Sequence, residues 1–163
     1  MKLYGVVGWK NAGKTGLMER LVTEITGRGF SVSTVKHAHH NFDVDHPGKD
    51  SYRHRAAGAH EVLLASRNRF ALMHELRGQD EPTLAQLLAL LAPVDLVLVE
   101  GYKRDAHPKV EAHRAVTGHP LLAPQNPTVR AVASDAAPAA PVPVLPLGDT
   151  AAIAEFITRE LGL

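Results

Sequence analysis

The sequence predicts an α/β fold in which a mostly parallel sheet is flanked by helices, and the first 36 residues carry this prediction. A short apolar strand over residues 3–7 precedes a glycine-rich stretch and a helix with Leu17, Leu21 and Ile25 at helical spacing. Residues 31–36 are rich in β-branched side chains and predict a second strand. Strand, helix and strand in this order form a βαβ unit, whose strands are parallel and whose crossover is right-handed.

Length and composition narrow the class of protein. The chain has 163 residues and is 45% apolar, so we expect a single domain over residues 1–163 with a substantial core. A net charge of +1 gives no general attraction to nucleic acid or to a membrane surface. The lack of cysteine excludes disulfides, thiolate zinc sites and cysteine nucleophiles. The chain begins with a strand and not with a leader, so we expect a cytoplasmic protein.

The middle of the chain predicts smaller elements. We expect a short helix over residues 52–57, capped by Asp50 or Ser51, and a hairpin of two strands over residues 60–66 and 69–75. Thr83 should cap a further helix. A leucine stripe on that helix is expected to be core, with a seam for a partner helix as the alternative. Its members are Leu84, Leu87, Leu88 and Leu91.

The last third returns to the sheet. Residues 94–101 form a nearly continuous apolar run, which predicts a central strand of a parallel sheet. Residues 109–113 and 129–134 predict two more strands, and residues 142–145 predict a brief pairing. Asp149 should cap a final helix. The apolar face of that helix consists of Ile153, Phe156, Ile157 and Leu161.

The glycine-rich stretch has the sequence G-x-x-x-x-G-K-T over residues 8–15. This pattern is typical of a phosphate-binding loop, whose main-chain N–H groups and following helix attract phosphate. Lys14 can reach the β- and γ-phosphates of a nucleotide, and the Thr15 hydroxyl can bind Mg²⁺. The alternative is an ordinary turn with an incidental lysine, which the flanking strand and helix disfavour. The expected nucleotide-binding residues are Gly8, Trp9, Lys10, Asn11, Ala12, Gly13, Lys14, Thr15 and Gly16.

Phosphate-loop proteins place an acidic group near Mg²⁺ at the end of a neighbouring strand. Glu100 and Asp95 flank the core of the central strand. The phosphate loop follows the first strand, so the site lies at the carboxyl edge of the sheet, where Glu100 is expected. Asp95 is five residues back, about 16 Å away at about 3.3 Å per residue. We therefore predict that Glu100 holds Mg²⁺ or orients water, with a solvated strand-end acid as the alternative.

A polar stretch over residues 37–51 leaves the second strand at the same edge, where open α/β sheets bind ligands. Asp45 in this stretch is a second predicted Mg²⁺ ligand, with a solvated loop acid as the alternative. The histidines there could bind zinc, but the lack of a helical pair or thiol disfavours tight metal binding. These histidines are His37, His39, His40 and His46. His37, His39 and His40, directly after the strand, could instead hydrogen-bond a phosphate or second ligand.

Base recognition is predicted from the end of a late strand. The usual guanine reader, Asn-Lys-x-Asp, is absent, but Asp135 follows Ala133 and Ser134 where such a reader would lie. A carboxylate there can accept hydrogen bonds from N1–H and N2–H₂ of guanine, a pair of donors that adenine lacks. We predict that Asp135 reads guanine, with a plain helix or turn cap as the alternative.

Longer stretches carry a more specific signal than the phosphate loop alone. They are residues 8–15, 35–40 (V-K-H-A-H-H), 43–45 (D-V-D), 47–51 (P-G-K-D-S), 57–59 (A-G-A), 98–103 (L-V-E-G-Y-K), 108–111 (P-K-V-E) and 131–135 (A-V-A-S-D). With these stretches the chain resembles the molybdopterin-guanine dinucleotide biosynthesis adapter family, MobB, over nearly its whole length.

The resemblance implies a P-loop NTPase fold related to the signal-recognition and MinD-like GTPases. It implies GTP as ligand, weak hydrolysis, a homodimer, and a guanylyltransferase partner that attaches GMP to molybdopterin. Molybdopterin itself is a further possible ligand. By this resemblance the loop over residues 8–15 binds phosphate and Glu100 is the strand-end acid. Lys10 lies one place from the intermonomer lysine of the MinD-like pattern, and we do not assign it that role.

Three functions are compatible with these residues. The first is a GTP-binding adapter with weak GTPase activity that assists the guanylyltransferase step of molybdenum cofactor synthesis. The second is a small-molecule kinase that uses ATP, for which residues 67–77 would have to supply a lid. The third is a scaffold in which the phosphate loop only stabilises the fold.

Overall fold

The computed structural model describes residues 1–38 and 42–163. The chain divides into two compact units, Met1–His37 with Leu91–Leu163, and Ala38–Leu90. None of the helices described is long and apolar enough to cross a membrane. The elements are β1 (Lys2–Val7), α1 (Lys14–Gly27), β2 (Val32–Lys36), α2 (Asp50–Ala56), β3 (Glu61–Ala65), β4 (Phe70–His74), α3 (Leu84–Leu88), β5 (Leu96–Glu100), β6 (Lys109–His113), the 3₁₀ turns η1 (Ala115–Thr117) and η2 (Ala123–Gln125), β7 (Val129–Ser134), β8 (Val144–Pro146) and α4 (Thr150–Leu161).

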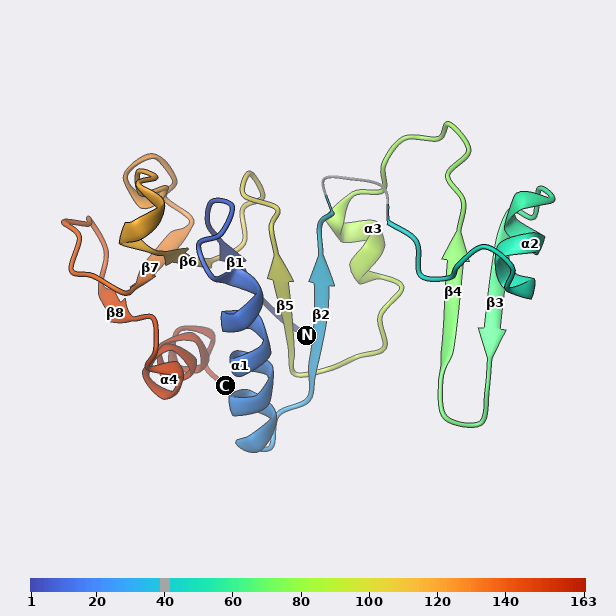
Figure 1. Ribbon diagram of the computed structural model, residues 1–163. Coiled ribbons are helices and arrows are strands. Elements are labelled where there is room, and N and C mark those ends of the chain that lie inside the picture. Colours follow the sequence, from blue (N-terminus) through green and yellow to red (C-terminus); the bar gives the residue numbers. More distant parts are fainter. Residues whose placement is uncertain (39–41) are drawn as a thin grey trace. The chain divides into compact units, whose positions relative to one another are not determined.

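A six-stranded sheet forms the centre of the first unit (Figure 1). Its strands lie in the order β2-β5-β1-β6-β7-β8, and all five neighbouring pairs are parallel. The predicted fold class is therefore confirmed. Although β1 and β2 belong to one βαβ unit, β5 lies between them. All five residues of β5 are buried, which explains its nearly continuous apolar sequence.

Helices α1 and α4 cover one face of this sheet and lie side by side (Figure 1). Arg28 joins the end of α1 to α4, because its guanidinium donates to Glu155 and to the Ala151 carbonyl. The Asp149 side chain accepts a hydrogen bond from the Ala152 N–H and caps α4, as predicted. The fully buried helix residues are Leu17, Leu21 and Ile25 from α1, and Ile153, Ala154 and Ile157 from α4.

The opposite face of β6 buries two charged side chains, Lys109 and Glu111, both 0% exposed. They are two residues apart on a strand and therefore share a face. The Lys109 ammonium donates to the Thr128 hydroxyl and to the carbonyls of Asp105 and His107, so all three of its N–H groups have acceptors. Burial lowers the pKa of Lys109 to about 8. The group therefore remains mostly charged at neutral pH and ties the chain before β6 to the sheet.

The Ala38–Leu90 unit contains α2, the β3–β4 hairpin and α3. The hairpin is antiparallel, as predicted, with Leu63 opposite Leu72. Thr83 caps α3 as predicted, in a capping box with Gln86.

Two local predictions in this unit need correction. The N-cap of α2 is Lys49, because the helix already begins at Asp50, so neither Asp50 nor Ser51 caps it. In the leucine stripe only Leu84 is buried, and the other members are half-buried. Helix α3 has five residues, too few to keep a stripe ending at Leu91 on one face.

His107 gives the fold a pH-dependent weakness. It is 9% exposed, and among the described residues neither ring nitrogen has a hydrogen-bond partner. Burial, together with the charge of Lys109, lowers the pKa of His107 to about 4. The folded chain thus resists protonation of a group that the unfolded chain protonates readily.

We expect the free energy of unfolding to fall as the pH drops from about 6.5 to about 4. In this window the unfolded chain binds a proton on His107 and the folded chain does not. This difference lowers the free energy of unfolding by at most about 3 kcal/mol. Urea unfolding at several pH values measures the effect. His107→Leu should flatten this part of the profile, whereas His46→Gln, at an exposed histidine, should follow the wild type. Identical slopes for the wild type and His107→Leu would contradict the prediction.

Candidate functional site

The predicted phosphate loop connects β1 to α1 at the carboxyl edge of the sheet. Gly8 has a φ of 149°, and a Cβ atom there would lie 2.4 Å from the Ala112 carbonyl oxygen of β6. Only glycine lets the loop leave β1 so close to that strand. Asn11 has a φ of 64°, a conformation that asparagine tolerates better than most residues.

Helix α1 begins at Lys14, and within the described part of the chain no side chain caps its amino end. The first helical hydrogen bond runs from the Leu17 N–H to the Gly13 carbonyl. The N–H groups of Lys14, Thr15 and Gly16 thus have no acceptor within the helix and are suited to bind an anion.

Lys14 extends back along this loop. Its ammonium donates to the Trp9 carbonyl oxygen at 2.8 Å, which leaves two N–H donors for phosphate oxygens. Burial lowers the pKa of Lys14, the charge of Glu100 opposes this shift, and the charges of Lys103 and Lys36 add to it. The Lys14 ammonium thus feels the charges of one carboxylate and of two further cations, and a bound polyanion would stabilise this excess of positive charge.

Glu100 ends β5 and is almost fully buried, at the same edge of the sheet as the phosphate loop. Its carboxylate lies 3.6 Å from the ammonium of Lys36, the residue beside it in β2. Gly101 follows with a φ of 96°, and this positive φ allows the chain to turn away directly after Glu100. The placement agrees with the predicted metal or water-orienting role, which itself stays a prediction.

Asp95 lies at the other end of the sheet. Its carboxylate accepts hydrogen bonds from the N–H and the hydroxyl of Ser31, at 2.8 and 2.6 Å. These hydrogen bonds lower the pKa of Asp95 and hold the chain in place directly before β5. Asp95 therefore holds two strand ends together, far from the phosphate loop.

Asp135 follows β7, where the sequence places it, and its Oδ1 accepts a hydrogen bond from the Ala115 N–H at 2.8 Å. This bond caps the start of η1, which is the turn-cap alternative. A carboxylate has further lone pairs, so the cap does not use up its capacity to accept. Guanine recognition by Asp135 stays a prediction.

Asp45 belongs to the Ala38–Leu90 unit, whereas Thr15 and Glu100 belong to the other. It is buried, and the Arg55 guanidinium donates to both of its oxygens. This pairing lowers the pKa of Asp45. A Mg²⁺ ion at Asp45 would have to share the carboxylate with Arg55, and the predicted metal role stays open.

The histidine-rich stretch is described only in part, since His39 and His40 lie outside the described residues. His37 stacks at a tilt on Tyr102, with 4.9 Å between ring centroids. Among residues 1–38 and 42–163, no group of three or more His, Cys, Asp or Glu side chains is placed to hold a metal ion.

Three cations near the phosphate loop were not predicted as site residues. Lys36 pairs with Glu100, Lys103 lies 4.4 Å from the centre of the Trp9 ring, and the Arg114 guanidinium approaches Gly13. Lys36 could have been found, because it ends a predicted strand at the same edge of the sheet. Lys103 and Arg114 lie on connections whose paths the sequence does not reveal.

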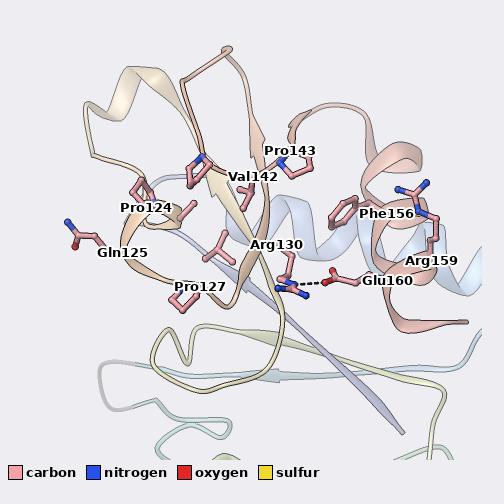
Figure 2. Close-up of a pocket in the computed structure, with 12 residues that line it drawn as sticks. Pro124, Gln125, Pro127, Arg130, Val142, Pro143, Phe156, Arg159 and Glu160 are labelled. Carbon is pink, nitrogen blue, oxygen red and sulfur yellow. Dashed lines mark hydrogen bonds and ion pairs between the residues drawn. The ribbon is translucent and has the colours of Figure 1, made fainter.

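A separate groove of about 780 Å³ lies between η2, the segment before β8, and α4 (Figure 2). Prolines and apolar side chains dominate its lining, and Arg130 and Glu160 form an ion pair within it. Its lining includes no residue of the phosphate loop, so it is distinct from the predicted nucleotide site.

The parallel sheet, with a glycine loop between a central strand and the helix that follows, defines a P-loop NTPase fold. The family model of MobB, described as molybdopterin guanine dinucleotide synthesis protein B, matches residues 3–135. The chain belongs to this family, which confirms the resemblance seen in the sequence.

Individual relatives agree. The molybdopterin-guanine dinucleotide biosynthesis adapter protein of Escherichia coli (strain K12) is 37% identical over 160 residues, which are 96% of this chain and 91% of that protein. The protein of the same name from Haemophilus influenzae is 42% identical over 122 residues, 73% of this chain and 67% of that one. The crystal structure of a MobB homolog from Bacillus stearothermophilus is 30% identical, covers 99% of both chains and has a TM-score of 0.70.

We expect Gly8→Ala to weaken binding of a GTP analogue at least 10-fold. The new Cβ would collide with the main chain of Ala112, which cannot move aside as a side chain can. Calorimetric titration measures the affinity. Gly27→Ala is the matched control, because a Cβ at this last residue of α1 meets no atom within 4 Å and lies at the end of the helix away from the loop, so the affinity should change little. Equal losses in the two variants would contradict the reasoning.

Proposed function

We propose that this protein is a GTP-binding adapter with weak GTPase activity that assists the guanylyltransferase step of molybdopterin guanine dinucleotide synthesis. Membership of the MobB family supports the pathway. The observation that carries the nucleotide role is Lys14, held along the phosphate loop beside Glu100 and two further lysines. The same family matches favour the adapter over a small-molecule kinase that uses ATP.

Hydrolysis would proceed by in-line attack of water on the γ-phosphate. Lys14 would neutralise charge on the β- and γ-phosphate oxygens, and Glu100 would orient the water. The Lys36 ammonium lies 3.6 Å from the Glu100 carboxylate and competes with the attacking water for it. This competition supports slow turnover until a partner or second copy completes the site.

Mg²⁺ fits the donor set, because hydroxyl and carboxylate oxygens are the ligands it prefers. Thr15 in the first turn of α1 and Glu100 at the end of β5 would hold it in the first unit. From the sequence alone we also propose that the Asp45 carboxylate binds Mg²⁺. When bound, the ion would neutralise negative charge on the β- and γ-phosphates. We also propose that Asp135 reads the guanine base.

We propose a homodimer as well. The hairpin leaves Leu63, Phe70 and Leu72 exposed, and Leu63 is the register partner of Leu72, so their side chains share a face. An apolar patch of this kind favours self-association. The proposed partner is the guanylyltransferase, and molybdopterin is a further possible ligand.

We also propose that the chain forms a single nucleotide-binding domain in the cytoplasm. The Ala38–Leu90 unit is inserted between β2 and β5, two strands that pair with each other. The chain therefore leaves the six-stranded sheet after β2 and returns to the same sheet at β5.

The central experiment is calorimetric titration with a GTP analogue and Mg²⁺. Lys14→Ala should weaken binding at least 10-fold through loss of its charged hydrogen bonds, whereas Lys2→Ala, on the first residue of β1, should bind as the wild type does.

Asp135→Ala should reduce the ratio of GTP affinity to ATP affinity. Added protein should raise molybdopterin guanine dinucleotide formation by the guanylyltransferase. Unmeasurable nucleotide affinity would favour the scaffold, and phosphate transfer to an acceptor other than water would favour the kinase.

Glu100→Gln should lower the Mg²⁺-dependent part of GTP affinity by about 10-fold, because a neutral amide is a poor ligand for Mg²⁺. Asp95→Asn is the matched control, at the residue directly before the same strand. It should cost stability through its Ser31 contacts while leaving the Mg²⁺ dependence unchanged. A greater loss of Mg²⁺ dependence in Asp95→Asn would overturn the assignment.

A further inference from the structure

Trp9, the second residue of the phosphate loop, is held by groups outside the loop. Its indole N–H donates to the Pro120 carbonyl at 2.8 Å, and its ring stacks on His119 with 5.4 Å between centroids. The Lys103 ammonium lies 4.4 Å from the ring centroid, a cation–π contact. Groups from two distant connections thus converge on one side chain.

The segment that holds Trp9 is itself fixed to the sheet by Glu111. This carboxylate is 0% exposed and accepts hydrogen bonds from the N–H groups of Leu122 and Ala123, at 2.7 and 2.9 Å. A buried carboxylate is stable only with such donors, so the main chain just beyond Pro120 has a defined position. Glu111 neighbours Ala112, whose carbonyl oxygen lies against Gly8 at the start of the loop.

The main chain of Trp9 contacts the residue that should meet phosphate. Its carbonyl oxygen accepts from the Lys14 ammonium at 2.8 Å and from the Ala12 N–H at 3.3 Å. A continuous series of contacts therefore runs from Glu111 through residues 119–123 and Trp9 to Lys14. We call Trp9 with residues 119–123 the Trp9 brace.

We propose that Trp9 and Glu111 are positioning residues of the nucleotide site. Trp9 holds the Lys14 ammonium in the orientation that would contact phosphate, and Glu111 acts on Trp9 through residues 119–123. The indole contacts fix the Trp9 carbonyl, and that carbonyl fixes one of the three N–H groups of Lys14. A loop that is ordered before binding does not have to be ordered by the nucleotide, which raises affinity. The inference rests on the proposed binding of GTP at this loop.

A double-mutant cycle tests the brace. Trp9→Phe keeps a ring for His119 and Lys103 but removes the hydrogen bond to Pro120, and calorimetry should show about 3- to 10-fold weaker binding of a GTP analogue. In a Lys14→Ala background the same change should alter affinity less than 2-fold, because it acts through Lys14. The same loss in both backgrounds, or no loss in the first, would overturn the inference.

Fluorescence provides a readout that a general loss of stability would not move. Trp9 is the one tryptophan in the chain, so the emission reports on the brace alone. Glu111→Gln should shift the emission to longer wavelength without nucleotide and weaken GTP binding, because an amide offers one acceptor oxygen where the carboxylate offers two. Tyr4→Phe, which removes a half-buried hydrogen bond to Glu160 of α4, should do neither. An unchanged spectrum in Glu111→Gln would remove Glu111 from the proposal.

The two levels of the proposal fail differently. A wild-type protein that binds no GTP analogue would overturn the proposed function and the brace together. A wild type that binds, with a Trp9→Phe variant that binds equally well, would overturn the brace alone. Trp9 is only half-buried, so Trp9→Phe should fold even if Glu111→Gln does not.

Discussion

The parallel pairing of β5 between β1 and β2 is the constraint on which the rest of the structure depends. Its apolar residues are buried on both faces, and its register aligns Glu100 with Val6 on one side and with Lys36 on the other. A shift by one residue would turn every side chain of β5 to the other face. The position of the acid relative to the phosphate loop therefore follows from packing in the sheet and not from contacts within the site.

The sequence predicts most of the fold because its strands and helices differ clearly in periodicity. The apolar residues of α1 and α4 recur at helical spacing, and β5 is apolar throughout. The failures are local. The cap of α2 was misplaced because Lys49 supplies only an extended backbone, and the leucine stripe of α3 outruns a helix of five residues.

The site was predicted where it depends on strand ends and missed where it depends on loops. Glu100 and the phosphate loop follow from the order of strand, glycine loop and helix. The contacts of Trp9 with Pro120 span 111 residues, and no local pattern announces them. The burial of the two charged side chains of β6 could not be predicted either. Lys109 and Glu111 have the sequence pattern of ordinary polar strand residues, and their hydrogen-bond partners lie on other segments.

The insertion of β5 between two earlier strands also affects how the chain assembles during synthesis. By the time β2 is complete, β1 lacks both of its hydrogen-bonded neighbours, since β5 and β6 lie more than 50 residues further along. At about 5–20 residues per second, the ribosome needs several seconds to deliver them. During that interval the nascent chain carries unpaired strand edges, which makes it prone to aggregate. The sheet can form only late in synthesis, because its central pairs join residues that are far apart in the sequence.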